Sequence, residues 1–99
     1  MPDLTELRAL ARAHVQLQDI VAETVDLSPQ RSNLRGCCPF HPDTAAGLYV
    51  GANGHFHCFS CGSEGDVVDW TMRLYMIDEA GAIERLLPPA FGGGEGQPA

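Results

Sequence analysis

The chain has 99 residues, and its 13 acidic residues outnumber six basic residues to give a formal net charge of −7. This length favours one domain, and the acidic balance argues against tight, sequence-blind binding to duplex DNA. No apolar run reaches membrane-spanning length, and the N-terminus lacks a signal-peptide pattern, so we expect no membrane association and a cytoplasmic location.

The N-terminal part of the chain has helical periodicity. Residues 3–14 carry leucines three and four positions apart, and Asp3 is the expected N-cap with Glu6 as its capping-box partner. The same period recurs over residues 17–25, either as the continuation of one bent helix or as a second helix. Residues 28–29, Ser-Pro, end the pattern.

Two pairs of potential metal ligands lie at the centre of the chain. The sequence CPFH at 38–41 is followed, after sixteen residues, by CFSC at 58–61. Two turns that each aim two ligands at one ion give a tetrahedron, and four protein ligands leave no position for water. The sequence therefore predicts one structural zinc ion, with this ligand set: Cys38, His41, Cys58 and Cys61.

Other roles for these cysteines are conceivable. Two disulfides in a secreted chain are an alternative, but the missing signal peptide and the placement of His41 favour zinc in a reducing compartment. Spacing alone allows either Cys37 or Cys38 to be the ligand. Cys38 is preferred because it gives the two-residue gap and lies in the Cys-Pro turn, and Cys37 is then expected to be a partly buried thiol. His55 and His57 are interpreted as ordinary strand residues beside the site.

Short β-prone segments surround the ligand pairs, at residues 33–36, 48–50 and 55–59. The Asn-Gly pair at 53–54 predicts a hairpin between the second and third segments. A ligand turn, a hairpin and a second ligand turn form a zinc ribbon. The expected fold is therefore α+β, a small antiparallel β-sheet flanked by N- and C-terminal helices.

The C-terminal part of the chain predicts two further helices. One begins after Asp66, the expected N-cap, with Asp69 at the third helical position. The other begins at Asp78 and ends before the two prolines at 88–89. Residues 88–99 are rich in Gly and Pro, and we expect them to form a disordered tail.

Several of these segments resemble one known family. GCCPFH at 36–41 and FHCFSCG at 56–62 resemble the ligand turns of the zinc-binding domain of bacterial-type (DnaG-type) DNA primases, and GDVV at 65–68 resembles the following helix start. The resemblance covers roughly residues 17–87. It implies a primase-type zinc-binding domain over residues 1–87, with the same four zinc ligands, that contacts single-stranded template DNA during RNA primer synthesis.

The sequence departs from that family in three respects. Residues 42–48 lack the usual basic residue and the Thr-Pro-Ser-Phe segment, and Ser60 replaces a usual glycine. The chain also has no room for the polymerase and helicase-binding modules of these primases. It is therefore expected to be a fragment, or a stand-alone chain that serves a separate catalytic subunit or helicase.

The leading functional hypothesis is a template-recognition module of a DNA primase. Exposed rings of Tyr49 and Phe59 would stack on unpaired bases, and Arg31 and Arg35 would hold phosphates. Core packing of the two rings and a solvated turn for the two arginines are the alternatives. The composition, rich in Ala, Gly and Arg with no Lys, indicates a GC-rich genome and suggests a bacterial, plasmid or phage origin.

Catalysis by the chain alone is not expected. The sequence has no P-loop or nucleophile–base pair, and the acidic run Glu64, Asp66 and Asp69 is interpreted as helix capping. The rival hypothesis is an acidic zinc-ribbon adaptor or regulator that binds a replication or transcription protein. The net charge and the missing basic contact favour it. A purely structural metal domain is the third reading.

Overall fold

The computed structural model describes residues 3–42 and 46–87. In these residues it has four helices and five strands, and the strands form one antiparallel sheet in chain order. This confirms the α+β prediction. The elements are α1 (Leu4–His14), α2 (Leu17–Ala22), β1 (Ser28–Gln30), β2 (Asn33–Gly36), β3 (Leu48–Val50), β4 (Phe56–Cys58), β5 (Glu64–Gly65), α3 (Val67–Tyr75) and α4 (Glu79–Leu86).

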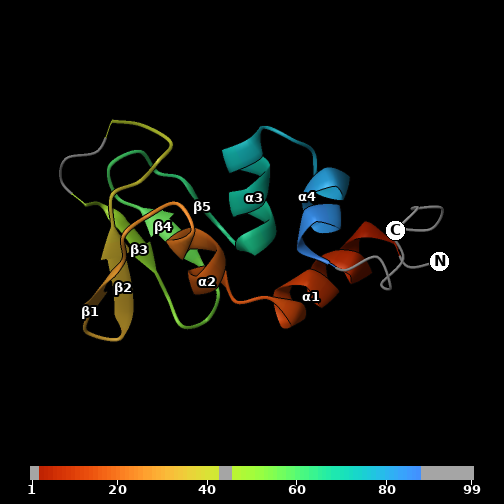
Figure 1. Ribbon diagram of the computed structural model, residues 1–99, viewed down its shortest axis with the longest axis horizontal. Helices are drawn as coiled ribbons and strands as arrows, with labels where there is room; N and C mark the ends of the chain where they lie inside the picture. The colour runs from red at the N-terminus through yellow and green to blue at the C-terminus, as the bar shows by residue number, and fades with distance from the viewer. Residues whose placement is uncertain (1–2, 43–45, 88–99) are drawn as a thin grey trace.

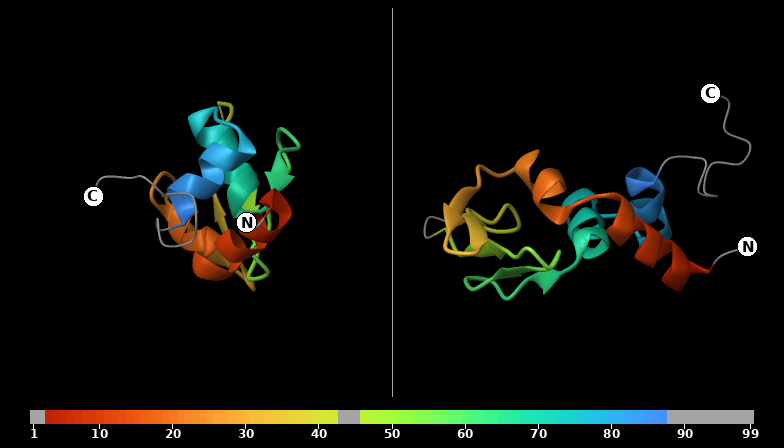
Figure 2. Two further views of the ribbon diagram at one scale, coloured as in Figure 1. Left: turned by 90° about the vertical axis from the view of Figure 1, so that its right-hand side faces the viewer. Right: turned by 90° about the horizontal axis from the view of Figure 1, so that it is seen from below.

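The sheet and the helices occupy different ends of the molecule (Figure 1). The strands lie at one end, α1 and α4 lie at the other, and α3 lies between them, as the right-hand view in Figure 2 also shows. Helix α3 contacts both α1 and α4 and also packs against β5. No helix among the described residues is long and apolar enough to cross a bilayer.

The N-terminal helical segment forms two helices. Asp3 accepts a hydrogen bond from the Glu6 N–H, and the Glu6 carboxylate accepts one from the Asp3 N–H, so the predicted capping box is confirmed. The extended backbone at Val15 and Gln16 separates α1 from α2. Helix α2 ends at Ala22, earlier than the periodicity to residue 25 indicated, and the chain then turns into β1.

The sheet has one buried face and one outward face. Leu48 and Val50 of β3 and Phe56 and Cys58 of β4 are buried, in the alternation of a half-covered sheet. The buried face belongs to the core, which includes Trp70 of α3. Two short strands, β1 and β5, were not predicted, because neither has the β-branched or aromatic residues that mark a strand.

Tight turns hold the strands in register. Between β3 and β4 the Gly51 N–H donates to the His55 carbonyl, and Gly54 has φ +81°, which agrees with the predicted Asn-Gly hairpin. Between β1 and β2 the turn is two residues long and begins at Arg31, which has φ +58°. Arg31 therefore lies on a sharp turn at the edge of the sheet.

The two C-terminal helices begin where the sequence predicts. Asp66 caps α3 and forms a capping box with Asp69, and Asp78 caps α4 through the Gly81 N–H. Helix α4 ends at Leu86, so the prolines at 88–89 and the expected tail over 88–99 lie outside the described residues.

Candidate metal centre and the outward sheet face

Four side chains from two turns converge beside the sheet. Cys38 and His41 come from the turn after β2, and Cys58 and Cys61 come from the end of β4 and the turn that follows. The Gly62 N–H donates to the Cys58 carbonyl, and Gly62 has φ +80°, the backbone angle that glycine favours. The ligand atoms of the four residues all lie within 4.8 Å of one another.

The separations suit a tetrahedral zinc ion. The sulfur atoms of Cys38 and Cys61 are 3.9 Å apart, and His41 Nε2 lies 3.3 Å from the sulfur of Cys58. With Zn–S bonds of about 2.3 Å and Zn–N bonds of about 2.0 Å, a tetrahedron places two sulfurs about 3.8 Å apart and a sulfur and nitrogen about 3.5 Å apart. Three thiolates and one imidazole therefore converge closely enough for small side-chain shifts to complete a tetrahedron about one metal ion.

Neighbouring groups orient these ligands. His41 Nδ1 lies 2.9 Å from the Pro42 carbonyl, which can only accept a hydrogen bond, so the ring proton belongs on Nδ1 and Nε2 is left to bind metal. The Phe40 N–H donates to the Cys38 sulfur, and the Ser63 hydroxyl lies 3.1 Å from the Cys61 sulfur. These contacts form the outer shell that structural metal sites need.

The surroundings of Cys38 and Cys58 shift the pKa values of these two buried cysteines in opposite directions. Without metal, burial raises the pKa of Cys38 to about 12. Burial also raises the pKa of Cys58, but the backbone N–H groups of Cys61 and Ser60 outweigh it, and the net pKa shift of Cys58 is downward. Metal binding at Cys38 must therefore displace a proton.

Cys37 does not belong to this group. It lies next to Cys38, yet only Cys38 has its sulfur in the cluster. The expectation that Cys37 is partly buried was wrong: the residue is exposed. The alternation of β2 continues past Gly36, which is buried, so that Cys37 points outward and Cys38 inward.

The outward face of the sheet carries a row of polar and aromatic side chains. Arg35, Tyr49, His57 and Glu64 are successive Cα partners across β2, β3, β4 and β5. We call these four residues the outer row. The Arg35 Nε donates to the Ala46 carbonyl, and its guanidinium carbon lies 5.5 Å from the centre of the Tyr49 ring.

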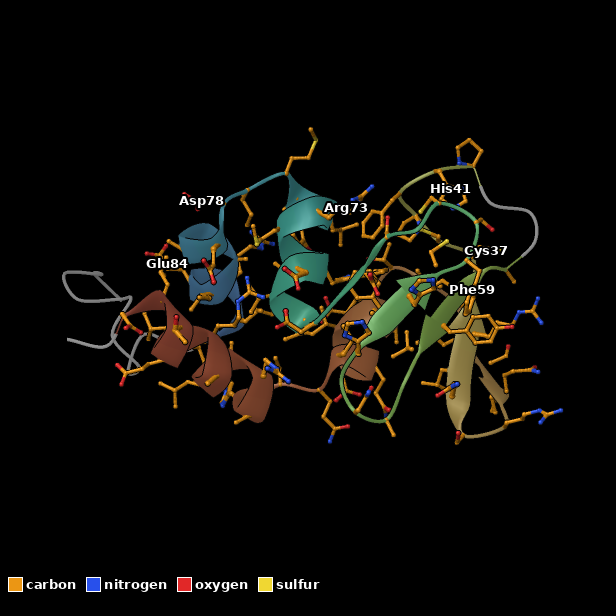
Figure 3. The ribbon with its side chains drawn as sticks, turned by 180° about the vertical axis from the view of Figure 1, so that it is seen from behind. Cys37, His41, Phe59, Arg73, Asp78 and Glu84 are labelled. Atoms are coloured by element: carbon orange, nitrogen blue, oxygen red, sulfur yellow. The ribbon has the colours of Figure 1, made fainter. Side chains whose placement is uncertain are left out.

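Phe59 extends this face beyond the end of β4. Its side chain is 71% exposed, and its ring centre lies 5.3 Å from Tyr49 and 4.4 Å from His57. Core packing is thus excluded for Phe59, whereas Tyr49 is half-buried between its neighbours. Figure 3 places Phe59, Cys37 and His41 at the sheet end of the molecule, away from Asp78 and Glu84.

A shallow hollow of about 390 Å³ opens on this face. Its walls combine aromatic rings, imidazoles and side-chain amides, and they comprise Asn33, Tyr49, Gly51, Asn53, His55, His57 and Phe59. His55 and His57, interpreted from the sequence as ordinary strand residues beside the zinc site, both line this hollow. The alternation from residue 55 to residue 59 was the signal that puts both of them on the side of Phe59.

The acidic run has two separate roles. Asp66 and Asp69 cap α3, as predicted. The capping interpretation was wrong for Glu64, which lies on β5 and contacts His57 Nδ1 at 3.4 Å and His55 Nε2 at 3.6 Å. Hydrogen bonds from His57 and then from His55 hold the Glu64 pKa below its ordinary value.

Comparisons with known proteins agree with this site. A family model described as the CHC2 zinc finger matches residues 5–90. The DNA primase of Mycolicibacterium smegmatis is 36% identical over 80 residues, which make up 79% of this chain and 13% of that protein. The DNA primase of Thermotoga maritima is 36% identical over 73 residues, which make up 73% of this chain and 13% of that protein.

A solved structure shows the same architecture. The crystal structure of the Aquifex aeolicus primase, with its zinc-binding and RNA polymerase domains, superimposes with a TM-score of 0.74 and 32% sequence identity. The match covers 87% of this chain and 21% of that one. Together with the ligand geometry, these matches identify Cys38, His41, Cys58 and Cys61 as the ligands of one zinc ion.

Proposed function

This chain belongs to the CHC2 zinc finger family of DnaG-type primases, and from that membership we propose that it recognises single-stranded template DNA during RNA primer synthesis. The observation that carries the proposal is the outward sheet face, where Tyr49, His57 and Phe59 surround a hollow. The chain spans about an eighth of the length of the curated primases that it matches.

Unpaired bases suit this face because they offer flat rings that duplex DNA hides. Phe59 is the most exposed ring, and it stands next to Tyr49 and His57. Each base stacked on an aromatic side chain contributes about 1–3 kcal/mol to binding. The amides of Asn33 and Asn53 line the same hollow and supply hydrogen-bonding groups for base edges.

Phosphate contacts are the smaller part of the proposal. Arg35 lies in the outer row, and Arg31 lies on the exposed turn before β2. Arg8 at the helical end is bound by the carboxylates of Asp66 and Glu79, so it is not proposed as a phosphate contact. With a net charge of −7, the salt dependence of binding should match only about one to three phosphate contacts.

Fluorescence anisotropy with short single-stranded and duplex oligonucleotides, over a salt series, tests the proposal. We expect weak binding that is selective for single strands. Phe59→Ala and Tyr49→Ala should weaken it and leave the salt slope unchanged, whereas Arg31→Ala and Arg35→Ala should each lower the slope by about one unit. Arg31 is the cleaner charge probe because Arg35 also holds the Ala46 carbonyl.

Matched controls lie at the helical end. Tyr75 is an exposed aromatic residue that contacts Arg85 of α4, 3.8 Å from the ring centre. Tyr75→Ala and Arg85→Ala should bind like the unsubstituted protein. If the chain bound no DNA even at low salt, the template role would be contradicted and the alternative function, an adaptor that binds a replication or transcription protein, would be favoured. Equal affinity for single-stranded and duplex DNA would contradict base stacking.

We further propose that primer synthesis requires a separate catalytic module, which is the partner of this chain. Template-dependent ribonucleotide incorporation should be absent for the pure chain and should rise when the chain is added to a primase polymerase module that lacks its own zinc domain. Incorporation by the pure chain would contradict this division of labour.

A further inference from the structure

Two histidines stand side by side on the outward face. His55 precedes β4 and His57 lies within it, while the residues that alternate with them, Phe56 and Cys58, are fully buried. The His-x-His spacing in extended backbone puts both imidazoles on one side of the sheet. Both also line the hollow described above, so they border open space and not the core.

The neighbouring strand brings a carboxylate to both imidazoles. Glu64 of β5 is the Cα partner of His57. One oxygen of Glu64, Oε1, lies 3.4 Å from His57 Nδ1 and 3.6 Å from His55 Nε2. One carboxylate oxygen of the adjacent strand therefore lies within 3.6 Å of a nitrogen of each imidazole.

We propose that His55, His57 and Glu64 form a second metal site, which binds a divalent transition-metal ion such as zinc on the outward face of the sheet. Imidazole nitrogen suits zinc, copper and nickel, whereas magnesium prefers oxygen ligands. Three protein ligands leave at least one coordination position for water or for another ligand. The site is thus chemically different from the closed site of Cys38 and its partners.

The two separations from Glu64 are close to what such an ion requires, and the imidazoles would turn about their side-chain bonds to bring their nitrogens together. With metal–ligand bonds of about 2.0–2.1 Å, two ligand atoms in a tetrahedron lie about 3.3 Å apart. The two nitrogen-to-oxygen distances of 3.4 and 3.6 Å need little adjustment. All three side chains are more than a third exposed, so they can make that adjustment and an ion can reach them.

The exposure also sets the strength of the site. An exposed site with three ligands is weaker than a site with four, so the second zinc should bind only after the first site is full. A bound ion would add positive charge to a face whose outer row carries one cation, Arg35. This inference does not depend on the proposed template role, because metal binding is measured without DNA.

Zinc titration of the one-zinc protein tests the proposal. The protein is prepared with one equivalent of zinc, and further zinc is added while binding is followed by isothermal titration calorimetry and metal analysis. We expect a second equivalent to bind. His55→Gln and Glu64→Gln should each weaken this second step by about tenfold or more, since even outer-shell partners of metal ligands contribute about 10–100-fold.

Controls separate this site from general surface binding. His14→Gln on α1 and Glu84→Gln on α4 change the same residue types at the helical end and should leave the second step unchanged. Cys37→Ser should also leave the second binding step unchanged, and this result would exclude the exposed Cys37 thiol as a ligand of the second zinc. Circular dichroism and retention of the first zinc verify that each variant is folded.

The position at which the second zinc binds can be followed by NMR. Addition of zinc to the one-zinc protein should shift the imidazole ¹⁵N resonances of His55 and His57 and leave that of His14 in place. The absence of a second equivalent at millimolar zinc would overturn the proposal. So would a second step that His55→Gln and Glu64→Gln do not weaken, or that Cys37→Ser abolishes.

Discussion

Arg8 of α1 and Asp66, the N-cap of α3, form an ion pair with a nitrogen-to-oxygen distance of 3.0 Å. Asp66 also accepts hydrogen bonds from the N–H groups of Val68 and Asp69 at the start of α3. The Arg8 guanidinium further contacts Asp69 at 3.2 Å and Glu79 of α4 at 2.8 Å. One arginine therefore joins three helices at the point where the chain leaves the sheet.

Replacement of Arg8 should destabilise the helical end. Arg8→Gln leaves the Asp66 carboxylate, whose side chain is only 13% exposed, without its main cation. We expect the free energy of unfolding to fall by about 1–3 kcal/mol. Urea denaturation of the zinc-saturated protein measures this loss.

Arg12→Gln is the matched control for Arg8→Gln. Arg12 is more than half exposed, and its Nε lies 3.8 Å from Asp66. An exposed ion pair of this kind contributes at most about 1 kcal/mol. A loss for Arg12→Gln as large as that for Arg8→Gln would contradict the central position of Arg8.

Two glycines near the second ligand turn should differ in their tolerance to alanine. Both have positive φ, but a Cβ at Gly65 would overlap the Asp69 side chain, whereas a Cβ at Gly62 meets no atom within 4 Å. We expect Gly65→Ala to cost about 2 kcal/mol or more and Gly62→Ala to cost about 1 kcal/mol. Thermal unfolding in excess zinc measures both, and equal losses would show that Asp69 moves aside freely.

Removal of zinc should unfold the sheet and leave part of the helical structure. Small zinc-binding domains gain about 10–16 kcal/mol of apparent free energy from the metal, more than a five-stranded sheet with strands of two to four residues can supply. Trp70 is fully buried and its ring packs against that of Phe40, which lies between two zinc ligands in the sequence. The fluorescence of Trp70 therefore reports the unfolding of the sheet. Unchanged spectra after verified zinc removal would contradict this expectation.

The two adjacent cysteines should respond differently to substitution by serine. Cys37→Ser should retain one zinc per chain, because the Cys37 sulfur lies outside the cluster of ligand atoms. Cys38→Ser should lose zinc in competition with a chelator. Full retention in Cys38→Ser with loss in Cys37→Ser, measured by metal analysis, would reverse the assignment.

The sequence was most informative where chemistry restricts the residue type. Asp3 and Asp66 are N-caps because few side chains can satisfy the free N–H groups of a helix, and both were predicted. The zinc ligands were predicted for a similar reason: only a few side chains bind zinc, and their spacing in the two turns is restricted.

The sequence was less informative where pairing between strands decides the structure. Strand β5 has only two residues, Glu64 and Gly65, and it exists because β4 offers hydrogen bonds to it. No local pattern could show that Glu64 would face His57. The end of α2 at Ala22 is likewise decided by the turn into β1 and not by helix propensity.

The alternation of β4 has a consequence for how this chain can diverge. Phe56 and Cys58 serve the core and the metal, whereas His57 between them and Phe59 beyond them serve the outward face. Selection can therefore alter the outward residues one at a time while the inward residues keep the scaffold intact. The outward surface can therefore differ between related chains while the core and the metal ligands stay the same.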